Sequence, residues 1–293
     1  MRTFLKMTYK TVAFCVVDSD YIDPAIVALT SFFRFNSTKV VCYVEEGTNY
    51  QRLRQATAGH PIEFRVVEFP QFQIHETLGN KYLELFVSRK SLPAFAMRIL
   101  ALQELKKEAD IIVNFDLDVL FFNTIQYLVD KCKPNRVYGV SERKNRDRWM
   151  SNLQLNDIIP NQVYINTGLV VYGAETIAPD LIEQYESFLH EFSKHIYCPE
   201  QDFVNHHFGN VIQEIPAHFN LMFTDERYTQ LAPVMVHFLG ADKPWTDHSY
   251  NDLYTRYYFK RYFLECKRNQ GCLTEHFSQK VRAKSECVGG VCV

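Results

Sequence analysis

The sequence predicts a single α/β domain followed by a short helical C-terminal segment. Apolar runs of strand length alternate with stretches of helical character from residue 12 to about residue 248. The first unit is typical of such folds, because an apolar run over residues 12–17 precedes a polar loop and an apolar helix. The composition, 47% hydrophobic and 23% charged over 293 residues, is that of a globular chain.

Apolar runs bounded by polar or turn residues predict the strands. We expect strands over residues 12–17, 39–44, 63–69, 111–122, 137–140, 162–172 and 211–216, and one more from residue 234. Helices are expected over residues 25–33, 51–58, 93–107, 125–129, 179–195 and 203–208. Pro24 and Pro93 stand at early helical positions, and Pro70 ends a strand. Residues 71–90 lack periodicity and predict a long excursion over the fold.

Charge and hydropathy limit the partners and the location of the chain. The formal net charge of −2 gives no overall basic field, so no nucleic-acid partner is expected. No window approaches the roughly 18 apolar residues of a transmembrane helix. The apolar run over residues 12–17 is too short for the core of a signal peptide and continues directly into Asp18. A cytoplasmic location is therefore the default expectation.

The eight cysteines form a scattered group and a group near the C-terminus. The scattered ones are expected to be small, buried hydrophobic residues: Cys15, Cys42, Cys132 and Cys198. The spacing of the others is not a standard zinc pattern. Reduced thiols, disulfides and a metal clip therefore remain open for Cys266, Cys272, Cys287 and Cys292.

Two aspartates interrupt the apolar run over residues 111–122. Residues two apart in an extended chain project to the same face, so Asp116 and Asp118 would present two carboxylates near the end of a buried strand. Carboxylates that close repel unless a cation lies between them, and hard oxygen ligands suit Mg²⁺ or Mn²⁺. The spacing alone is a weak signal, because a second pair, Asp18 and Asp20, also occurs.

Three other positions carry groups that suit ligand binding in an α/β sheet. Asp18 and Asp20 follow the first strand, where they would either accept hydrogen bonds from a ribose or a base or cap the next helix. Arg98 lies in a predicted helix and is either a surface charge or a phosphate ligand. Gly168 interrupts a strand, which indicates the close approach of backbone or ligand.

Six short stretches occur in this order: Asp18-Ser19-Asp20-Tyr21, Arg98, Phe115-Asp116-Leu117-Asp118, Asn166-Thr167-Gly168, Pro199-Glu200-Gln201-Asp202, and a run from His237 to Trp245. Together they resemble glycosyltransferase family 8 over roughly residues 12–245. The last run, His237-Phe238-x-Gly240-x-x-Lys243-Pro244-Trp245, is the most specific single match. The resemblance implies a retaining sugar transferase of the GT-A type, with a Rossmann-like nucleotide-sugar-binding domain and a mixed central sheet.

The resemblance also implies roles for the matching residues. Mn²⁺, with Mg²⁺ as the alternative, would be held by Asp116, Asp118 and His237. The uracil and ribose of a UDP-sugar would lie against Asp18, Asp20 and Tyr21. The diphosphate and the donor sugar would be contacted by Arg98, Asn166, Thr167, Gly168, Glu200, Gly240 and Lys243. The residues at the reacting centre would be Gln201, Asp202 and Lys243.

Elementary chemistry supports these roles. Breaking a sugar–phosphate bond creates an oxocarbenium-like sugar and a dianionic leaving group, which a divalent cation and Lys243 would stabilise. We expect departure and attack on the same face of the sugar, with the leaving phosphate oxygen taking the acceptor proton. Gln201 is a poor nucleophile, and the alternative is a covalent intermediate on Asp202.

Residues 1–248 are expected to form the catalytic domain and residues 249–293 a basic, aromatic tail. Such a tail would either lie peripherally on an anionic membrane, at its inner face, or pack on the domain with a solvated basic face. The arginine-containing stretch over residues 141–160 is either a lid on the acceptor side or a surface loop.

The leading hypothesis is a metal-dependent retaining glycosyltransferase that moves glucose or galactose from a UDP-sugar to a glycan, lipid-linked or protein acceptor. A metal-dependent nucleotidyltransferase or phosphatase is the first alternative, because these enzymes also place carboxylates at strand ends. A non-catalytic nucleotide-sugar-binding protein is the second. UDP release with Mn²⁺, compared with that of Asp116→Ala, separates all three.

Overall fold

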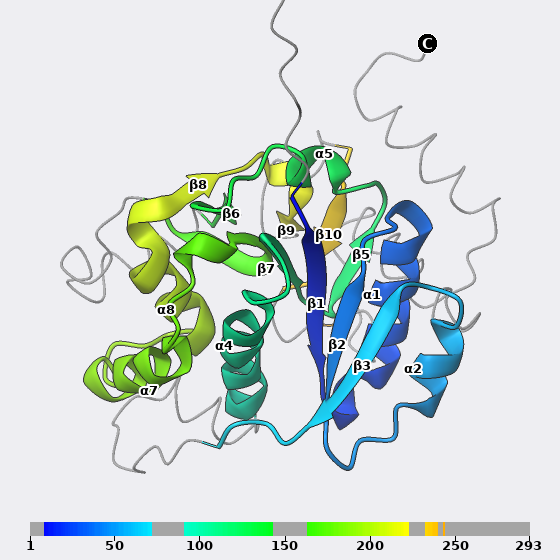
Figure 1. The fold of residues 1–293 in the computed structure, drawn as a ribbon, viewed down its shortest axis with the longest axis horizontal. Helices are drawn as coiled ribbons and strands as arrows, with labels where there is room; N and C mark the ends of the chain where they lie inside the picture. Colours follow the sequence, from blue (N-terminus) through cyan, green and yellow to red (C-terminus); the bar gives the residue numbers. More distant parts are fainter. Residues whose placement is uncertain (1–8, 72–90, 143–162, 223–231, 240–242, 244–293) are drawn as a thin grey trace, which may run out of the picture.

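A seven-stranded sheet forms the centre of the protein in the computed structural model, which describes residues 9–71, 91–142, 163–222, 232–239 and 243 (Figure 1). Its strands are β1 (Thr11–Val17), β2 (Val40–Glu45), β3 (Ile62–Val67), β4 (Ile111–Phe115), β6 (Val137–Ser141), β7 (Ile165–Gly173) and β8 (Ile212–Glu214). They lie in the order β3-β2-β1-β4-β7-β6-β8. The strands β3, β2, β1 and β4 run parallel to one another, whereas β7 runs antiparallel to both β4 and β6. The predicted α/β class and mixed sheet are confirmed.

Helices cover both faces of this sheet (Figure 1). One face carries α1 (Ile22–Phe35) and α2 (Gln51–Ala56), and the other carries α4 (Leu92–Leu105), α7 (Leu181–Glu191) and α8 (Pro199–Phe208). Ala13 and Cys15 pack into the core on the α1 side, whereas Phe14 and Val16 pack into the core on the α4 side. Burial on both faces explains why β1 is apolar throughout and lacks a polar alternation.

A smaller sheet of three strands lies beside the large one. It contains β5 (Val119–Phe121), β9 (Leu221–Met222) and β10 (Met235–His237), in the order β5-β10-β9. β10 runs antiparallel to β5 and places His237 opposite Val119. This pairing therefore brings β10, which lies more than a hundred residues later in the sequence, close to the end of β4.

The apolar stretch over residues 111–122 is not the single strand that the sequence predicted. β4 ends at Phe115, and the chain enters the smaller sheet at Val119. Asp116 N–H still bonds to a carbonyl of β7, at Gly168, but the carbonyl of Asp118 accepts the N–H of Phe238. The backbone changes partner between the two aspartates, so their side chains lie in a connection between two sheets.

The other predicted elements are present with shifted ends. The helix expected from residue 25 begins at Ile22, so Pro24 lies within its first turn. The helix expected over residues 179–195 is the shorter α7, and the one expected from residue 203 begins at Pro199. The short helix expected near residue 125 is α5 (Gln126–Val129). The 3₁₀ turns are η1 (Ser19–Tyr21), η3 (Ala174–Thr176), η4 (Gly209–Val211) and η5 (Ala217–Phe219).

Several predictions lie outside the described residues. They concern most of residues 71–90 and 141–160, Gly240, and the tail over residues 249–293 with its cysteines and its boundary. Cys15 and Cys42, register partners on β1 and β2, are buried free thiols as predicted, and Cys132 is also buried. Cys198 is only partly buried. None of the described helices combines the length and the apolar character needed to cross a membrane.

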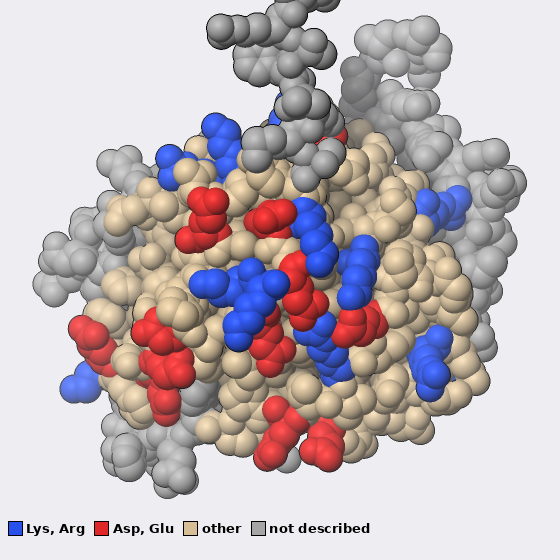
Figure 2. All heavy atoms as spheres, in the orientation of Figure 1, with Lys and Arg blue, Asp and Glu red and all other residues tan. Residues whose placement is uncertain are grey.

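Charged side chains of both signs are mixed on the face shown in Figure 2. The edge strand β3 illustrates the pattern, because Arg65 lies 2.7 Å from a carboxylate oxygen of Glu63 and 2.8 Å from one of Glu108. Pairs of this kind on a partly exposed surface contribute little stability but neutralise one another. The described part of this face therefore offers no broad basic area.

Candidate active site

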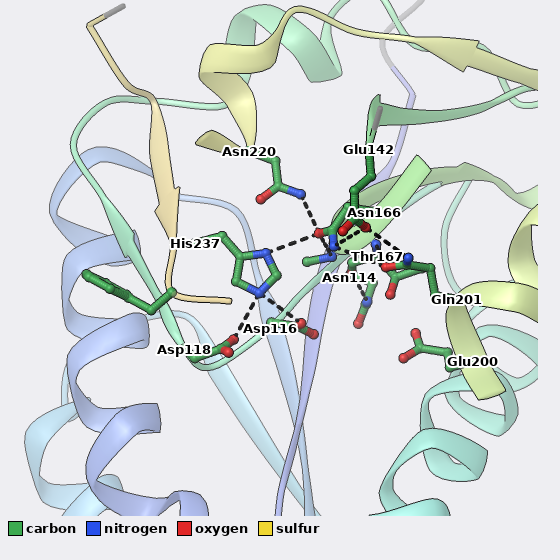
Figure 3. A network of polar contacts seen from close by, with 12 residues as sticks. Asn114, Asp116, Asp118, Glu142, Asn166, Thr167, Glu200, Gln201, Asn220 and His237 are labelled. Atoms are coloured by element: carbon green, nitrogen blue, oxygen red, sulfur yellow. Dashed lines mark hydrogen bonds and ion pairs between the residues drawn. The ribbon is translucent and has the colours of Figure 1, made fainter. Parts of the chain in front are cut away.

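Asp116, Asp118 and His237 form a compact group where the two sheets meet (Figure 3). His237 Nε2 lies 3.4 Å from Asp116 Oδ2 and 3.2 Å from Asp118 Oδ1. One potential ligand atom from each residue lies within 4.8 Å of the others. Across the described part of the chain, no other cluster of three acidic, histidine or cysteine side chains has this arrangement.

This donor set fits one divalent cation. An octahedral cation with ligands at about 2.1 Å places neighbouring ligand atoms about 3 Å apart, close to both separations from His237 Nε2. Two carboxylates and one imidazole form a mixed oxygen and nitrogen shell, which suits Mn²⁺. The three residues that the sequence singled out as ligands are thus brought together by the fold.

Fixed positive charge surrounds the carboxylates. Lys243 donates hydrogen bonds to Asp118 Oδ2 and, at 2.8 Å, to the carbonyl oxygen of Phe238. Burial favours the neutral acid at Asp118, but Lys243 and His237 outweigh it and hold the pKa of Asp118 well below its usual range. Burial lowers the pKa of His237, but Asp118 and Asp116 outweigh burial and raise that pKa to about 9. When no cation is bound, the positive charges of the protonated His237 imidazole and of Lys243 offset the negative charges of the two carboxylates.

Arg98 connects the acid pair to α8. Its side chain is 15% exposed, and Nη1 lies 2.6 Å from Asp116 Oδ1 and 2.8 Å from Glu200 Oε2. Burial raises the pKa of Glu200 to about 7, although Arg98 opposes this shift. Asp116 Oδ1 is buried, and its close contact with Arg98 is an ion pair without hydrogen-bond geometry. Arg98 is therefore a site residue and not a surface charge.

Gly168 on β7 lets His237 approach the backbone. A Cβ atom at this position would lie 2.1 Å from His237 Nδ1, so a side chain here would displace the imidazole. The close approach that the sequence predicted at Gly168 is confirmed, and its partner is the third candidate metal ligand. Asn166 lies two residues earlier on β7, and its Oδ1 accepts the Gly168 N–H at 2.9 Å and faces His237 Nδ1 at 3.1 Å.

Gln201 joins the first turn of α8 to β7. Its Nε2 donates to Tyr164 Oη (2.8 Å) and Glu142 Oε2 (2.9 Å). Its Oε1 accepts from Asn166 Nδ2 (3.0 Å) and from the N–H of Thr167 (3.2 Å). All polar atoms of this buried amide are therefore engaged, and Gln201 fixes α8 against the strand that carries the site (Figure 3).

Asp202 is buried and holds the start of α8. Its Oδ1 accepts from Tyr164 O–H at 2.8 Å, and its Oδ2 accepts the backbone N–H groups of Tyr197 (2.7 Å) and Cys198 (2.9 Å). Burial raises the pKa of this carboxyl group. Both oxygens of Asp202 thus have structural partners, which leaves it poorly placed to attack a sugar.

The loop after β1 lies close to the acid pair. Asp18 Oδ1 accepts the N–H groups of Asp20 (3.0 Å) and Tyr21 (3.1 Å), so Asp18 caps η1, one of the two alternatives that the sequence allowed. Burial raises the pKa of Asp18. Burial, Asp118 and Asp116 all raise the pKa of Tyr21, so its phenol lies within the field of the acid pair. Asp20 is exposed.

The family follows from a comparison of the whole sequence. Residues 12–249 match the sequence model of glycosyl transferase family 8, which is well over half of the chain. The chain belongs to this family. It is a glycosyltransferase, and the alternatives of a nucleotidyltransferase or a phosphatase are set aside. A search of curated protein sequences finds no match.

Solved structures show that this family 8 glycosyltransferase has the GT-A-type fold. The galactosyltransferase LgtC, solved with donor and acceptor sugar analogues, is 17% identical, with a TM-score of 0.66, and the match covers 92% of this chain and 99% of that one. The bifunctional glycosyltransferase WbbM is 16% identical, with a TM-score of 0.62 over 97% of this chain and 53% of that one. GlyE of Streptococcus pneumoniae TIGR4 is 14% identical, with a TM-score of 0.58 over 95% and 64%.

Several polar residues of the family 8 site were not found from the sequence: Asn114, Glu142, Tyr164 and Asn220. All four are buried, and Glu142 and Asn220 both bond to Asn166 (Figure 3). Glu142 directly follows β6 and lies two residues after the strand predicted over residues 137–140, so its place near a strand end was a usable signal. Asn220 lies 54 residues from Asn166 and carries no local pattern that indicates the contact.

Proposed function

We propose that this glycosyltransferase is metal-dependent and retaining, and that it moves a hexose, glucose or galactose, from a UDP-sugar to a glycan, lipid-linked or protein acceptor. The observation that carries the proposal is the group of Asp116, Asp118 and His237, with Lys243 bonded to Asp118. Two acids, an imidazole and an ammonium in one buried place suit the binding of a cation together with a diphosphate.

The metal ligands would be Asp116, Asp118 and His237, with Mn²⁺ as the ion and Mg²⁺ as the alternative. A bound divalent cation supplies Lewis-acid stabilisation of the leaving diphosphate. Lys243 would move its hydrogen bonds from Asp118 to diphosphate oxygens and stabilise the charge that develops on them. Gly240 would approach the same diphosphate through its backbone.

The donor would lie between the loop after β1 and the first turn of α8. Asp18, Asp20 and Tyr21 would contact the uracil and ribose, and the cap that Asp18 forms holds this loop in shape. Residues on the facing side would contact the donor sugar and its phosphate: Arg98, Asn166, Thr167, Gly168 and Glu200. The ion pair between Arg98 and Glu200 supports this placement, because it ties α4 to α8 beside the acid pair.

The anomeric configuration would be retained because the diphosphate leaves from the same face of the sugar that the acceptor oxygen attacks. The bond from the anomeric carbon to the phosphate oxygen breaks, a bond to the acceptor oxygen forms, and the acceptor proton passes to the leaving phosphate oxygen. The contacts of Asp202 favour this route over a covalent intermediate, because three donors already use its two oxygens. Gln201 would instead hold α8 beside the reacting centre. An adduct on Asp202, detected by mass spectrometry with a slow donor, would overturn this proposal.

The tail after residue 248 would be a separate segment that touches an anionic membrane at its inner face. The support is its composition, since aromatic residues alternate with lysine and arginine there. The full chain should sediment with anionic liposomes, and a chain ending at residue 248 should not. Equal sedimentation of both would contradict a membrane role for the tail.

UDP release tests the proposed activity. The chain is incubated with UDP-glucose, UDP-galactose and other UDP-sugars, with Mn²⁺ or with a chelator. We expect UDP release that needs Mn²⁺ and that Asp116→Ala abolishes. Asp180→Asn, which changes an exposed acid at the start of α7, is the matched control. The absence of both UDP release and metal-dependent UDP binding would refute the proposal.

A further inference from the structure

Two buried carboxamide side chains, those of Asn166 and Asn220, lie on the Nδ1 side of His237 (Figure 3). Asn166 Oδ1 faces His237 Nδ1 at 3.1 Å, and Asn220 Nδ2 donates to the same Oδ1 at 2.8 Å. Asn166 comes from β7, whereas Asn220 stands directly before β9. Asn220 is completely buried, and Asn166 is 4% exposed. Neither position was linked to the metal group by the sequence.

The partners of Asn166 decide which way its amide points. Gly168 N–H, 2.9 Å from Oδ1, is a backbone donor and has no acceptor role. On the other side, Nδ2 lies 3.1 Å from a carboxylate oxygen of Glu142 and 3.0 Å from Gln201 Oε1. Reversing the amide would set a donor against a donor and an oxygen against a carboxylate. The oxygen of Asn166 is therefore the atom that faces His237.

This orientation fixes the imidazole. An amide oxygen only accepts hydrogen bonds, so His237 Nδ1 must carry the proton that it donates to Asn166. The other ring nitrogen, Nε2, then faces Asp116 and Asp118 with its lone pair free in the neutral ring. A histidine that binds a metal is commonly oriented in this way by a partner on its second nitrogen.

We propose that Asn166 and Asn220 are positioning residues that keep His237 Nδ1 protonated and direct Nε2 toward the cation site. The proposal rests on the proposed metal-dependent function, because it names what Nε2 would bind. It gives Asn166 a positioning role in addition to the proposed donor-sugar contact. Both hydrogens and the oxygen of its amide are already used within the network, so a sugar hydroxyl would have to displace one of them.

Asn220 shows that this arrangement serves more than packing. Its Oδ1 is buried and has no hydrogen-bond partner among the described residues. A buried orphan acceptor destabilises a protein, so leucine, of similar size, would be tolerated on stability grounds alone. Among the described residues, the one hydrogen bond that the Asn220 side chain makes is the bond to Asn166. The Asn220→Leu change therefore separates positioning from structural support.

The test combines Mn²⁺ binding with a signal from the imidazole itself. Mn²⁺ affinity of the full chain is measured by electron paramagnetic resonance for wild type, Asn166→Ala and Asn220→Leu. We expect losses of about 10- to 100-fold for Asn166→Ala and about 10-fold for Asn220→Leu. Thermal unfolding of Asn220→Leu without metal should occur at or above the wild-type temperature. Thr57→Val, which removes a buried hydrogen bond remote from the site, should lower only the unfolding temperature.

The second readout is the Nδ1–H group of His237 in the metal-free chain. With ¹⁵N-labelled histidine, NMR should show a slowly exchanging N–H assigned to Nδ1 by its ring couplings, separate from the Nε2–H that the protonated ring directs at Asp116 and Asp118. The Nδ1–H signal should disappear in Asn166→Ala and in His237→Asn. Absence of that signal in wild type, or its persistence in Asn166→Ala, would overturn the proposal. So would unchanged Mn²⁺ affinity in both asparagine variants. A wild-type chain that binds no Mn²⁺ would instead refute the proposed function, and the N–H signal would still decide the orientation of His237.

Discussion

Two pairs of aspartates share one spacing and one kind of location, yet they have different surroundings. Asp18 and Asp20 follow β1, and Asp116 and Asp118 follow β4, the strand beside it in the sheet. The Asp18 carboxylate accepts hydrogen bonds from backbone N–H groups of its own loop, and Asp20 is exposed. Asp118 instead meets His237 and Lys243, both from the far end of the described chain.

The difference shows that the Asp-x-Asp spacing does not decide the chemistry. Burial raises the pKa of Asp18, whereas Lys243 and His237 overcome burial and lower the pKa of Asp118. The surroundings of the two pairs differ because of the smaller sheet. In that sheet β10 pairs with β5 and brings His237 to the second pair alone. The first pair is left for hydrogen bonding, and the second can hold a cation.

The largest expected effect comes from removing one acid of the second pair. Asp118→Asn should lower the rate of UDP release by about 1000-fold or more, because loss of a metal ligand removes several kcal/mol of charge stabilisation. Asp20→Asn, the equivalent change in the first pair, should lower it by about 10-fold at most. Steady-state rates at saturating donor with Mn²⁺ measure both. Similar losses for the two variants would remove the distinction between the pairs.

The sequence predicted the strands, the helices and the candidate metal ligands, but not the long-range contacts that bring them together. The alternating apolar pattern indicates β1 because its burial on both faces is visible locally. The change of sheet between Asp116 and Asp118 depends on Phe238, 120 residues from Asp118, and local periodicity carries no such information. Gly168 signalled a close approach, but only the fold shows that His237 is the partner. Asn220 gave no signal at all.

The next effect concerns the ammonium that only the second pair receives. Lys243→Met should lower the rate of UDP release by about 100-fold, because a fixed donor to the leaving group is lost. Its Mn²⁺ affinity should stay equal or rise, since the ammonium no longer competes for Asp118. Rate measurements and Mn²⁺ titrations on the same preparation separate the two effects. A Mn²⁺ affinity that falls together with the rate would show that Lys243 supports the metal site itself.

The opposite pKa shifts of Asp18 and Asp118 predict opposite effects of pH on stability. The folded-state pKa of Asp118 is lowered, so its contribution is present above its unfolded pKa of about 4 and is lost as pH falls. Asp118→Asn should therefore cost about 3 kcal/mol at pH 7 without metal, because Lys243 and His237 lose a buried partner. The cost should shrink toward pH 3. Denaturant unfolding at both pH values measures it, and a cost that does not depend on pH would contradict the ion-pair explanation.

The smallest effect is expected at Asp18. Its folded-state pKa is raised, so ionisation of Asp18 lowers stability as pH rises past its unfolded pKa of about 4. Asparagine caps a helix as well as aspartate does, so Asp18→Asn should change stability by less than about 1 kcal/mol at pH 7. Its effect on the donor KM should be a modest increase. A large loss of stability in the same unfolding experiment would show that its charge has a partner in the folded state.

Mn²⁺ binding in the presence of UDP tests the central claim most directly. The wild-type chain should bind one Mn²⁺, with affinity strengthened by UDP, and Asp20→Asn should bind it with nearly the same affinity. Asp118→Asn should show no specific binding. Full binding by Asp118→Asn, or a loss confined to Asp20→Asn, would contradict the assignment of the cation to the pair that follows β4.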